Sequence, residues 1–151
     1  MRSDLLDEQA QKPYPSRKKL DSPPHGKRVI VLAGPTATGK TRLSFELARL
    51  VDGEIISADS VQVYRGMDIG TAKASTEERM DVPHHLIDIC DLSNSFNVVQ
   101  FYEAATEACR DIQSRGRVPI VVGGTGFYLH ALLYGPPEGP PASQEVRQKL
   151  E

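Results

Sequence analysis

The chain has 151 residues, of which 39% are hydrophobic, and a formal net charge of −2. This length is sufficient for one domain with a real core, and the near-balanced charge gives no sign of the strongly basic surface typical of nucleic-acid-binding domains. No apolar run is long enough for a transmembrane helix and the first residues lack the apolar stretch of a signal peptide, so we expect no membrane association.

Residues 1–27 are polar and rich in proline, serine, lysine and aspartate, a composition that predicts a disordered tail. The basic cluster Arg17, Lys18 and Lys19 could touch RNA, but a solvated tail accounts for it better. The two cysteines, Cys90 and Cys109, have neither the spacing of a metal site nor that of a disulfide framework. They indicate reduced thiols in a cytoplasmic protein.

From Arg28 onward, apolar runs that suit buried strands alternate with segments of helical spacing. The predicted strands are 29–33, 54–58, 85–89 and 119–122. One predicted helix begins near Lys40, and two more span 98–115 and 127–133. This alternation indicates an α/β fold with a parallel sheet and helices on both faces. Residues 143–151 resemble the opening of a further helix. Because such sheets usually have about five strands, we expect the chain to be the N-terminal part of a longer protein.

Residues 34–41 read G-P-T-A-T-G-K-T and match the phosphate-loop pattern G-x-x-x-x-G-K-[ST] at every fixed position. The loop lies between a predicted strand and a predicted helix, as the motif requires. Its glycines let the backbone wrap an anion, the helix contributes its positive dipole end, and the lysine adds a point charge. The threonine hydroxyl can reach a phosphate oxygen or a Mg²⁺ ion. The predicted phosphate-binding residues are Gly34, Pro35, Thr36, Ala37, Thr38, Gly39, Lys40 and Thr41.

A second candidate segment, residues 57–73, reads S-A-D-S-V-Q-V-Y-R-G-M-D-I-G-T-A-K and directly follows the second predicted strand. Asp59 should emerge at the same sheet edge as the phosphate loop, because ligands bind outside the carboxyl ends of parallel strands. Beside a polyphosphate, its carboxylate could hold Mg²⁺, accept a proton from a nucleophile, or cap a helix.

A third segment, residues 123–126, reads G-G-T-G after the last predicted strand. Paired glycines let a backbone approach a ligand, and Thr125 offers a hydroxyl near a helix start, although it could equally be a helix N-cap. His84 and His85 should face opposite sides of a strand, which favours structural or hydrogen-bonding roles. The rings of Tyr64, Phe127 and Tyr128 could stack on a base or pack in the core.

In order and spacing, these three segments, with P-H-H-L-I-D-I between the last two, resemble the tRNA dimethylallyltransferases, also called tRNA isopentenyltransferases. The resemblance covers residues 28–151 and implies a catalytic core of the P-loop nucleotide-hydrolase type. It implies transfer of a dimethylallyl group from dimethylallyl diphosphate to the exocyclic amine of an adenine beside the anticodon of tRNA. The phosphate loop would then hold the diphosphate of the prenyl donor rather than the phosphates of ATP.

The resemblance also assigns roles to residues. Lys40, Thr41 and a Mg²⁺ ion, bound indirectly through Thr41, would stabilise the leaving diphosphate. Asp59 would take the proton from the adenine amine. The adenine, flipped out of its stack, would be lined by the residues after the second strand, and the glycine-rich turn and C-terminal segment would contact the tRNA anticodon stem-loop. These tRNA-binding residues are Asp59, Ser60, Val61, Gln62, Thr125 and Arg147. No stable protein partner is expected.

Two other interpretations fit the motifs. A small phosphate-loop kinase acting on a metabolite with ATP would need a Walker-type aspartate, for which Asp59 and Asp88 are candidates, and an arginine-rich lid, which is not evident. The second interpretation is a non-catalytic fragment that binds a diphosphate or has no activity. Members of the resembled family are about twice this length, so the basic tRNA surface and the closing strands would lie in the part that follows.

Overall fold

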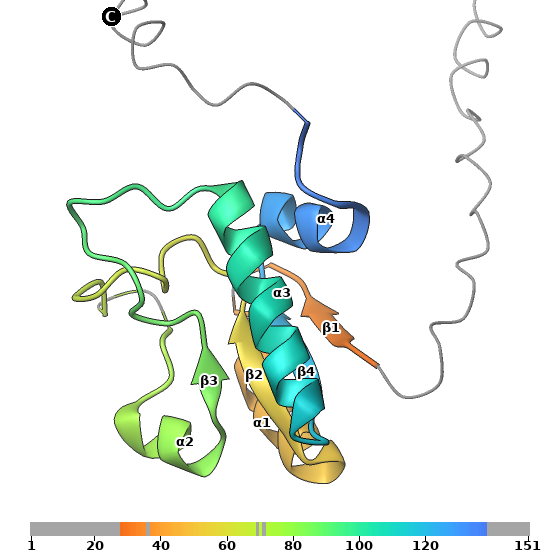
Figure 1. Cartoon of the computed structure of the whole chain (residues 1–151). Coiled ribbons are helices and arrows are strands. Elements are labelled where there is room, and N and C mark those ends of the chain that lie inside the picture. Colours follow the sequence, from red (N-terminus) through yellow and green to blue (C-terminus); the bar gives the residue numbers. More distant parts are fainter. Residues whose placement is uncertain (1–27, 36, 69, 71, 139–151) are drawn as a thin grey trace, which may run out of the picture.

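The computed structural model describes residues 28–35, 37–68, 70 and 72–138. The predicted tail at 1–27 and the predicted helix at 143–151 lie outside these residues. Within them, strands and helices alternate along the chain (Figure 1). The elements are β1 (Ile30–Ala33), α1 (Lys40–Val51), β2 (Gly53–Ser57), α2 (Thr76–Asp81), β3 (His84–His85), α3 (Val98–Ser114), β4 (Val118–Gly123) and α4 (Gly126–Tyr134).

The described strands form one parallel sheet in the order β1-β4-β2-β3. One row of the sheet pairs Ile30 with Ile120, Ile120 with Ile55, and Ile55 with His84. Since all strands run in the same direction, their carboxyl ends meet at one edge. The loops that follow β1, β2 and β4 therefore emerge together, as the sequence predicted.

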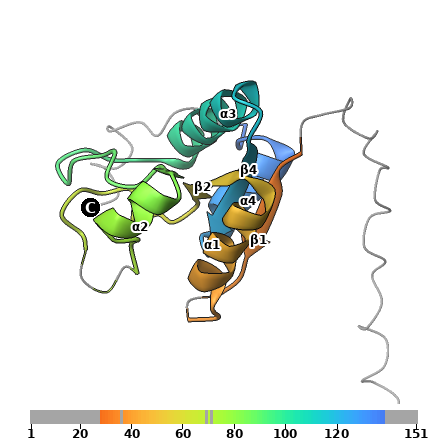
Figure 2. The same ribbon diagram turned by 90° about the horizontal axis from the view of Figure 1, so that it is seen from below.

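Helices cover both faces of the sheet, which confirms the predicted three-layer α/β fold. Figure 2 shows α3 on one side of the sheet and α1 on the other. Successive strand residues point to opposite faces, so Ile55 and Ile120 pack with Phe45 of α1. Their neighbours Ile56 and Val121 pack against α3 and α4.

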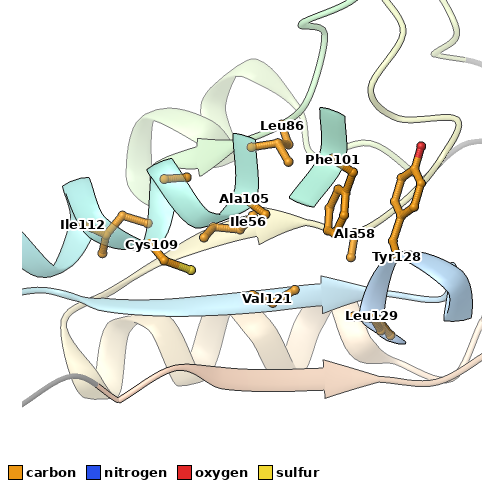
Figure 3. Close-up of a cluster of buried hydrophobic side chains, with 11 residues drawn as sticks. Ile56, Ala58, Leu86, Phe101, Ala105, Cys109, Ile112, Val121, Tyr128 and Leu129 are labelled. Carbon is orange, nitrogen blue, oxygen red and sulfur yellow. The ribbon is translucent and has the colours of Figure 1, made fainter. Parts of the chain in front are cut away.

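The larger core cluster lies between the sheet and α3 and α4 (Figure 3). Phe101, Ala105 and Ile112 recur at helical spacing on α3 and are buried, which confirms the helix predicted at 98–115. Tyr128 stacks on Phe101 with ring centroids 4.2 Å apart and is only 5% exposed. Its ring is thus part of the core, and the suggestion that it stacks on a base is wrong.

Two elements differ from the prediction. The third strand is His84–His85 rather than 85–89, because Leu86 and Asp88 adopt positive φ angles of 62° and 55° and turn the chain out of the sheet. The helix α2 was not predicted, although Ser75 and Glu78 form the reciprocal hydrogen bonds of a capping box at its start. Both differences lie beside the cleft described below.

A buried carboxylate joins β2 to β3 and to the connection between α3 and β4. The Glu54 side chain is 1% exposed and accepts hydrogen bonds from Arg115 Nη2 (2.8 Å), Arg117 Nη1 (2.8 Å) and His85 Nε2 (2.7 Å). The hydrogen bonds from Arg115 lower the pKa of Glu54 most. Burial opposes them, the bonds from His85 and Arg117 add to them, and the pKa falls from 4.5 to about 2. His85 therefore has the hydrogen-bonding role predicted for it.

Across the described part of the chain, no helix is both long enough and apolar enough to cross a membrane. Cys90 and Cys109 are free thiols, and burial raises the pKa of the Cys109 thiol to about 11. Such a thiol stays protonated near neutral pH and behaves as a small core side chain.

Candidate phosphate-binding active site

A cleft of about 720 Å³ opens at the carboxyl edge of the sheet. Its walls come from three segments that are distant in sequence, each following a different strand. The phosphate loop and the start of α1 contribute Pro35, Ala37, Thr38, Gly39, Lys40 and Thr41; the segment after β2 contributes Asp59, Ser60, Val61 and Gln62; and the end of β4 contributes Gly123, Gly124 and Thr125.

The phosphate loop ends in a helix start that has no side-chain cap. Gly39 occupies the N-cap position of α1 with φ 83°, and no acidic side chain lies in the first turn. The first N–H groups of a helix have no partner within the helix, so this turn presents donors and a positive dipole end to the cleft. Ala37 also has a positive φ, 63°. Alternating left-handed residues of this kind orient successive N–H groups towards an anion.

The two side chains with the clearest phosphate chemistry lie at the start of α1. Lys40 Nζ donates to the carbonyl of Pro35 and to Thr38 Oγ1 (3.3 Å), which holds the ammonium over the loop. Thr41 is exposed and also lines the cleft. Gly34, by contrast, lies behind the loop, where its N–H donates to Gly123 O at 3.4 Å. Thr36 lies outside the described residues.

Asp59 lies just after β2 and lines the same cleft. Its Oδ1 accepts hydrogen bonds from Val61 N (2.8 Å) and Gln62 N (3.1 Å) and so closes a turn. The considered role as a helix cap is wrong, because no helix begins at this position. For the second oxygen, Oδ2, the described residues provide no hydrogen bond. The carboxylate is therefore fixed by one oxygen, and its residue lines the cleft.

The glycine-rich turn serves close contact between backbones. A Cβ on Gly123 would lie 2.2 Å from Ala58 O, and a Cβ on Gly124 would lie 3.0 Å from Gly34 O. These glycines admit the neighbouring backbone, and both also line the cleft, so their approach to a ligand stays a prediction. Thr125 occupies the N-cap position of α4 without a side-chain cap bond. Its Oγ1 accepts instead from Ser60 N at 3.0 Å, and this bond joins the turn to the Asp59 segment.

The floor of the cleft was not predicted. Ile55, Ala74, His84 and Val122 line it and give it an apolar base. The Nδ1 atom of His84 lies 2.7 Å from Val82 O, and burial lowers the pKa of the imidazole. A neutral ring that donates from Nδ1 presents Nε2 as an acceptor. A sequence signal existed, because the His-His pair follows Pro83 at a strand start, but no spacing linked it to the phosphate loop.

The structure thus brings together the predicted phosphate-loop residues that it describes, except Gly34, with Asp59, Ser60, Val61, Gln62 and Thr125. Arg147 lies outside the described residues. Phe127, suggested as either a base-stacking or a core residue, is 59% exposed. Tyr64 is not among the residues that line the cleft. Its hydroxyl oxygen accepts a hydrogen bond from Phe96 N at 3.0 Å.

The parallel sheet and the phosphate loop define this molecule as an α/β protein of the P-loop class. Family models identify it further. A model described as "IPP transferase" matches residues 62–151, and one described as "Isopentenyl transferase" matches residues 27–94. The chain belongs to the IPP transferase family.

Curated relatives include a tRNA dimethylallyltransferase of Protochlamydia amoebophila (strain UWE25), 62% identical over 143 residues, which are 95% of this chain and 40% of the relative. A tRNA dimethylallyltransferase of Chlamydia felis (strain Fe/C-56) is 62% identical over 81% of this chain and 36% of its own length. The chain therefore spans about 40% of the length of these relatives.

Solved structures agree. A full-length tRNA isopentenylpyrophosphate transferase of Bacillus halodurans matches with a TM-score of 0.71 and 50% identity over 82% of this chain and 41% of that protein. A tRNA delta(2)-isopentenylpyrophosphate transferase of Staphylococcus epidermidis matches with a TM-score of 0.68 and 50% identity, over 81% of this chain and 40% of the other. A eukaryotic dimethylallyltransferase described as acting on tRNA matches with a TM-score of 0.71 and 38% identity, over 83% of this chain and 32% of that protein.

Proposed function

We propose that the protein transfers a dimethylallyl group from dimethylallyl diphosphate to the exocyclic amine of an adenine beside the anticodon of tRNA. The observation that supports this most is that Asp59 and the phosphate loop line the same cleft. A phosphate site and a proton acceptor are what a displacement of diphosphate by an amine requires. The names of the relatives provide the donor and the acceptor.

The leaving group is stabilised by the phosphate loop. When the amine nitrogen attacks the allylic carbon, an N–C bond forms, the C–O bond to the diphosphate breaks, and negative charge grows on the diphosphate oxygens. The N–H groups of the first turn of α1, with Lys40 and Thr41, face that charge. The diphosphate is already anionic in the donor and gains a further negative charge as the C–O bond breaks, so fixed donors of this kind bind the donor and stabilise the transition state more strongly.

The proton of the amine passes to Asp59. The carboxylate is held by Val61 N and Gln62 N at Oδ1, which leaves Oδ2 to accept it. The adenine would lie against Ser60, Val61 and Gln62, and Thr125 would contact the RNA beside it. A base in a stacked anticodon loop must leave its stack to enter such a cleft, so these residues recognise an extruded nucleotide.

The residues present suit a Mg²⁺ ion that is held chiefly by the diphosphate and by water. Among the described residues no group of three or more metal-ligating side chains occurs, whereas Thr41 offers one hydroxyl beside the phosphate loop. This matches the usual binding of Mg²⁺, which keeps several waters and takes few protein ligands. When bound, the ion would neutralise charge on the diphosphate.

Label transfer tests this function. The protein is incubated with radiolabelled dimethylallyl diphosphate, unmodified tRNA and Mg²⁺, and the RNA is then digested to nucleosides. The expected result is label on the exocyclic amine of one adenosine, lost with tRNA whose target adenine is replaced by guanine. Tight binding of ATP without any binding of the five-carbon donor would contradict the proposal and favour a kinase.

A further inference from the structure

Lys73 is a buried ammonium that the proposed reaction leaves without a role. Its side chain is 4% exposed, and lysine is almost never buried to this extent unless it is paired. Nζ donates to Tyr64 O (2.6 Å), Asp68 Oδ1 (2.9 Å) and Asp88 Oδ1 (2.6 Å). Three acceptors therefore meet the three N–H bonds of the ammonium.

Asp88 extends this contact to α2. Its Oδ2 accepts from Arg79 Nη1 at 2.7 Å, and Arg79 Nε also donates to Ala74 O at 2.8 Å. Two cations thus face two carboxylates. We call Lys73, Asp68, Asp88 and Arg79 the lysine clasp. The charges balance around the buried Lys73, whereas Asp88 and Arg79 are partly exposed and Asp68 is 70% exposed.

The backbone of the clasp is strained. Asp88 has φ 55° and Ala72 has φ 51°, both in the left-handed region that residues with a Cβ seldom adopt. Such conformations cost about 1–3 kcal/mol each and persist where the surroundings determine them fully. The three hydrogen bonds of Lys73 join the segments on which both residues lie.

The clasp is connected to Asp59 through a short series of hydrogen bonds. Asp88 N donates to Gln62 O at 3.1 Å, and Gln62 N donates to Asp59 Oδ1 at 3.1 Å. Nearby, Ile89 N donates to Val63 O at 2.9 Å, so the segment after β3 runs beside the loop after β2 (Figure 1). The turn that carries Asp59 is thus held in part by Asp88, which is itself bound by Lys73.

The clasp also borders the cleft itself. Ala72 and Ala74 precede and follow Lys73, and both line the cleft. None of the partners of Lys73 belongs to the phosphate loop. A change at Lys73 should therefore move the wall on which the adenine would lie and leave the diphosphate site in place.

We propose that Lys73 is a positioning residue, whose buried ammonium fixes Asp59 at the distance and orientation that proton transfer requires. The proposal rests on the proposed function. It goes further by assigning to a residue outside the cleft lining a selective effect on the chemical step. A misplacement of about 1 Å in a reacting group can cost about 100-fold in rate.

The first experiment does not depend on activity. Amide hydrogen exchange is followed by NMR in the wild-type chain, in Lys73→Met and in Arg65→Met. Arg65 lies in the same loop and pairs with Asp91 at 2.7 Å, but its side chain is 56% exposed, so it serves as the matched control. We expect Lys73→Met to speed exchange at Gln62 N and Asp88 N at least tenfold and to leave Val121 N unchanged. Arg65→Met should alter none of the three.

The second experiment measures transfer and donor affinity in the same variants. Lys73→Met should lower kcat about 10- to 100-fold while the affinity for dimethylallyl diphosphate stays within about twofold. Lys73→Arg should not restore the rate, because a planar guanidinium cannot reproduce three bonds from one nitrogen in a closed site. If Lys73→Met does not fold, Asp88→Asn keeps the shape and the acceptor oxygen while weakening the pair.

The outcomes separate the two proposals. Unchanged exchange at Gln62 and Asp88 overturns the role of Lys73, whatever the enzyme does. Faster exchange with an unchanged kcat overturns it as well, since the turn would then move without effect on the reaction. If even the wild type transfers no label, the proposed function fails, and the exchange data alone decide whether Lys73 fixes the Asp59 turn.

Discussion

Replacing Glu54 with glutamine should remove a pH-dependent part of the stability of the fold. The carboxylate is almost fully buried, and hydrogen bonds from Arg115, His85 and Arg117 hold its pKa at about 2 instead of 4.5. Each pKa unit corresponds to about 1.4 kcal/mol. The charged form of Glu54 therefore stabilises the folded state by about 3 kcal/mol near neutral pH.

The sign follows from the direction of the pKa change. A carboxyl whose pKa is lower in the folded state contributes its full stability above pH 4.5 and loses it as the pH falls towards 2. Between pH 6 and pH 3 the wild type should lose about 2 kcal/mol from this group alone. Glu54→Gln has no such carboxyl, so its stability should fall less over the same interval.

Urea unfolding of both proteins at half-unit steps between pH 6 and pH 3 provides the measurement. The free energy of unfolding of the wild type, minus that of Glu54→Gln, should shrink by about 2 kcal/mol as the pH falls. Glu46→Gln is the matched control, because Glu46 pairs with Arg42 on the surface and is 59% exposed. Its difference from the wild type should stay within about 0.5 kcal/mol at every pH. A wild-type minus Glu54→Gln difference that is constant with pH would refute this reasoning.

Three further predictions concern the cleft. Asp59→Asn keeps an acceptor for the two turn amides but cannot take a proton, so turnover should fall about 10²–10⁴-fold. Its affinity for the donor should be unchanged in an equilibrium binding assay. An equal loss of turnover and donor affinity would argue against Asp59 as the base. Lys40→Ala should weaken donor binding at least about tenfold in the same assay, and unchanged affinity would refute its role. Gly123→Ala forces a Cβ to within 2.2 Å of Ala58 O and should lower the free energy of unfolding by more than about 2 kcal/mol. Gly126→Ala, where nothing lies within 4 Å, should leave it within about 1 kcal/mol of the wild type.

Much of the architecture was predictable because local patterns and the global fold agree. The phosphate-loop spacing, the apolar runs of β1, β2 and β4, and the buried face of α3 each indicated the element that the structure contains. Parallel strands place their carboxyl ends at one edge, so Asp59 could be placed opposite Lys40 without any distance information. The capping box of Ser75 and Glu78 is a further sequence signal, which marks the start of α2 although that helix is too short to show a clear periodicity.

Other features depend on contacts between distant residues and leave no local trace. The run from Leu86 to Ile89 has the alternation of a strand, but Asp88 turns out of the sheet towards Lys73 and Arg79. The glycine at position 123 suggested a ligand, whereas the close neighbour is the backbone of Ala58. No spacing rule relates these pairs. The roles of individual cleft residues remain predictions until the variants are measured.

The in-register row from Ile30 through Ile120 to Ile55 has a consequence for how the site comes into being. The phosphate loop and the Thr125 turn are separated by most of the chain, and only the pairing of β1 with β4 brings them together. An unfolded or half-assembled chain thus has no cleft, so the donor should bind the assembled sheet alone and raise its melting temperature with the logarithm of the donor concentration above the Kd. A slip of one residue in that row would reverse which side chains face α1, and would carry the phosphate loop about 3.3 Å away from its partners. Substitutions at Ile120, at a distance from any reacting atom, should accordingly impair ligand binding through misalignment.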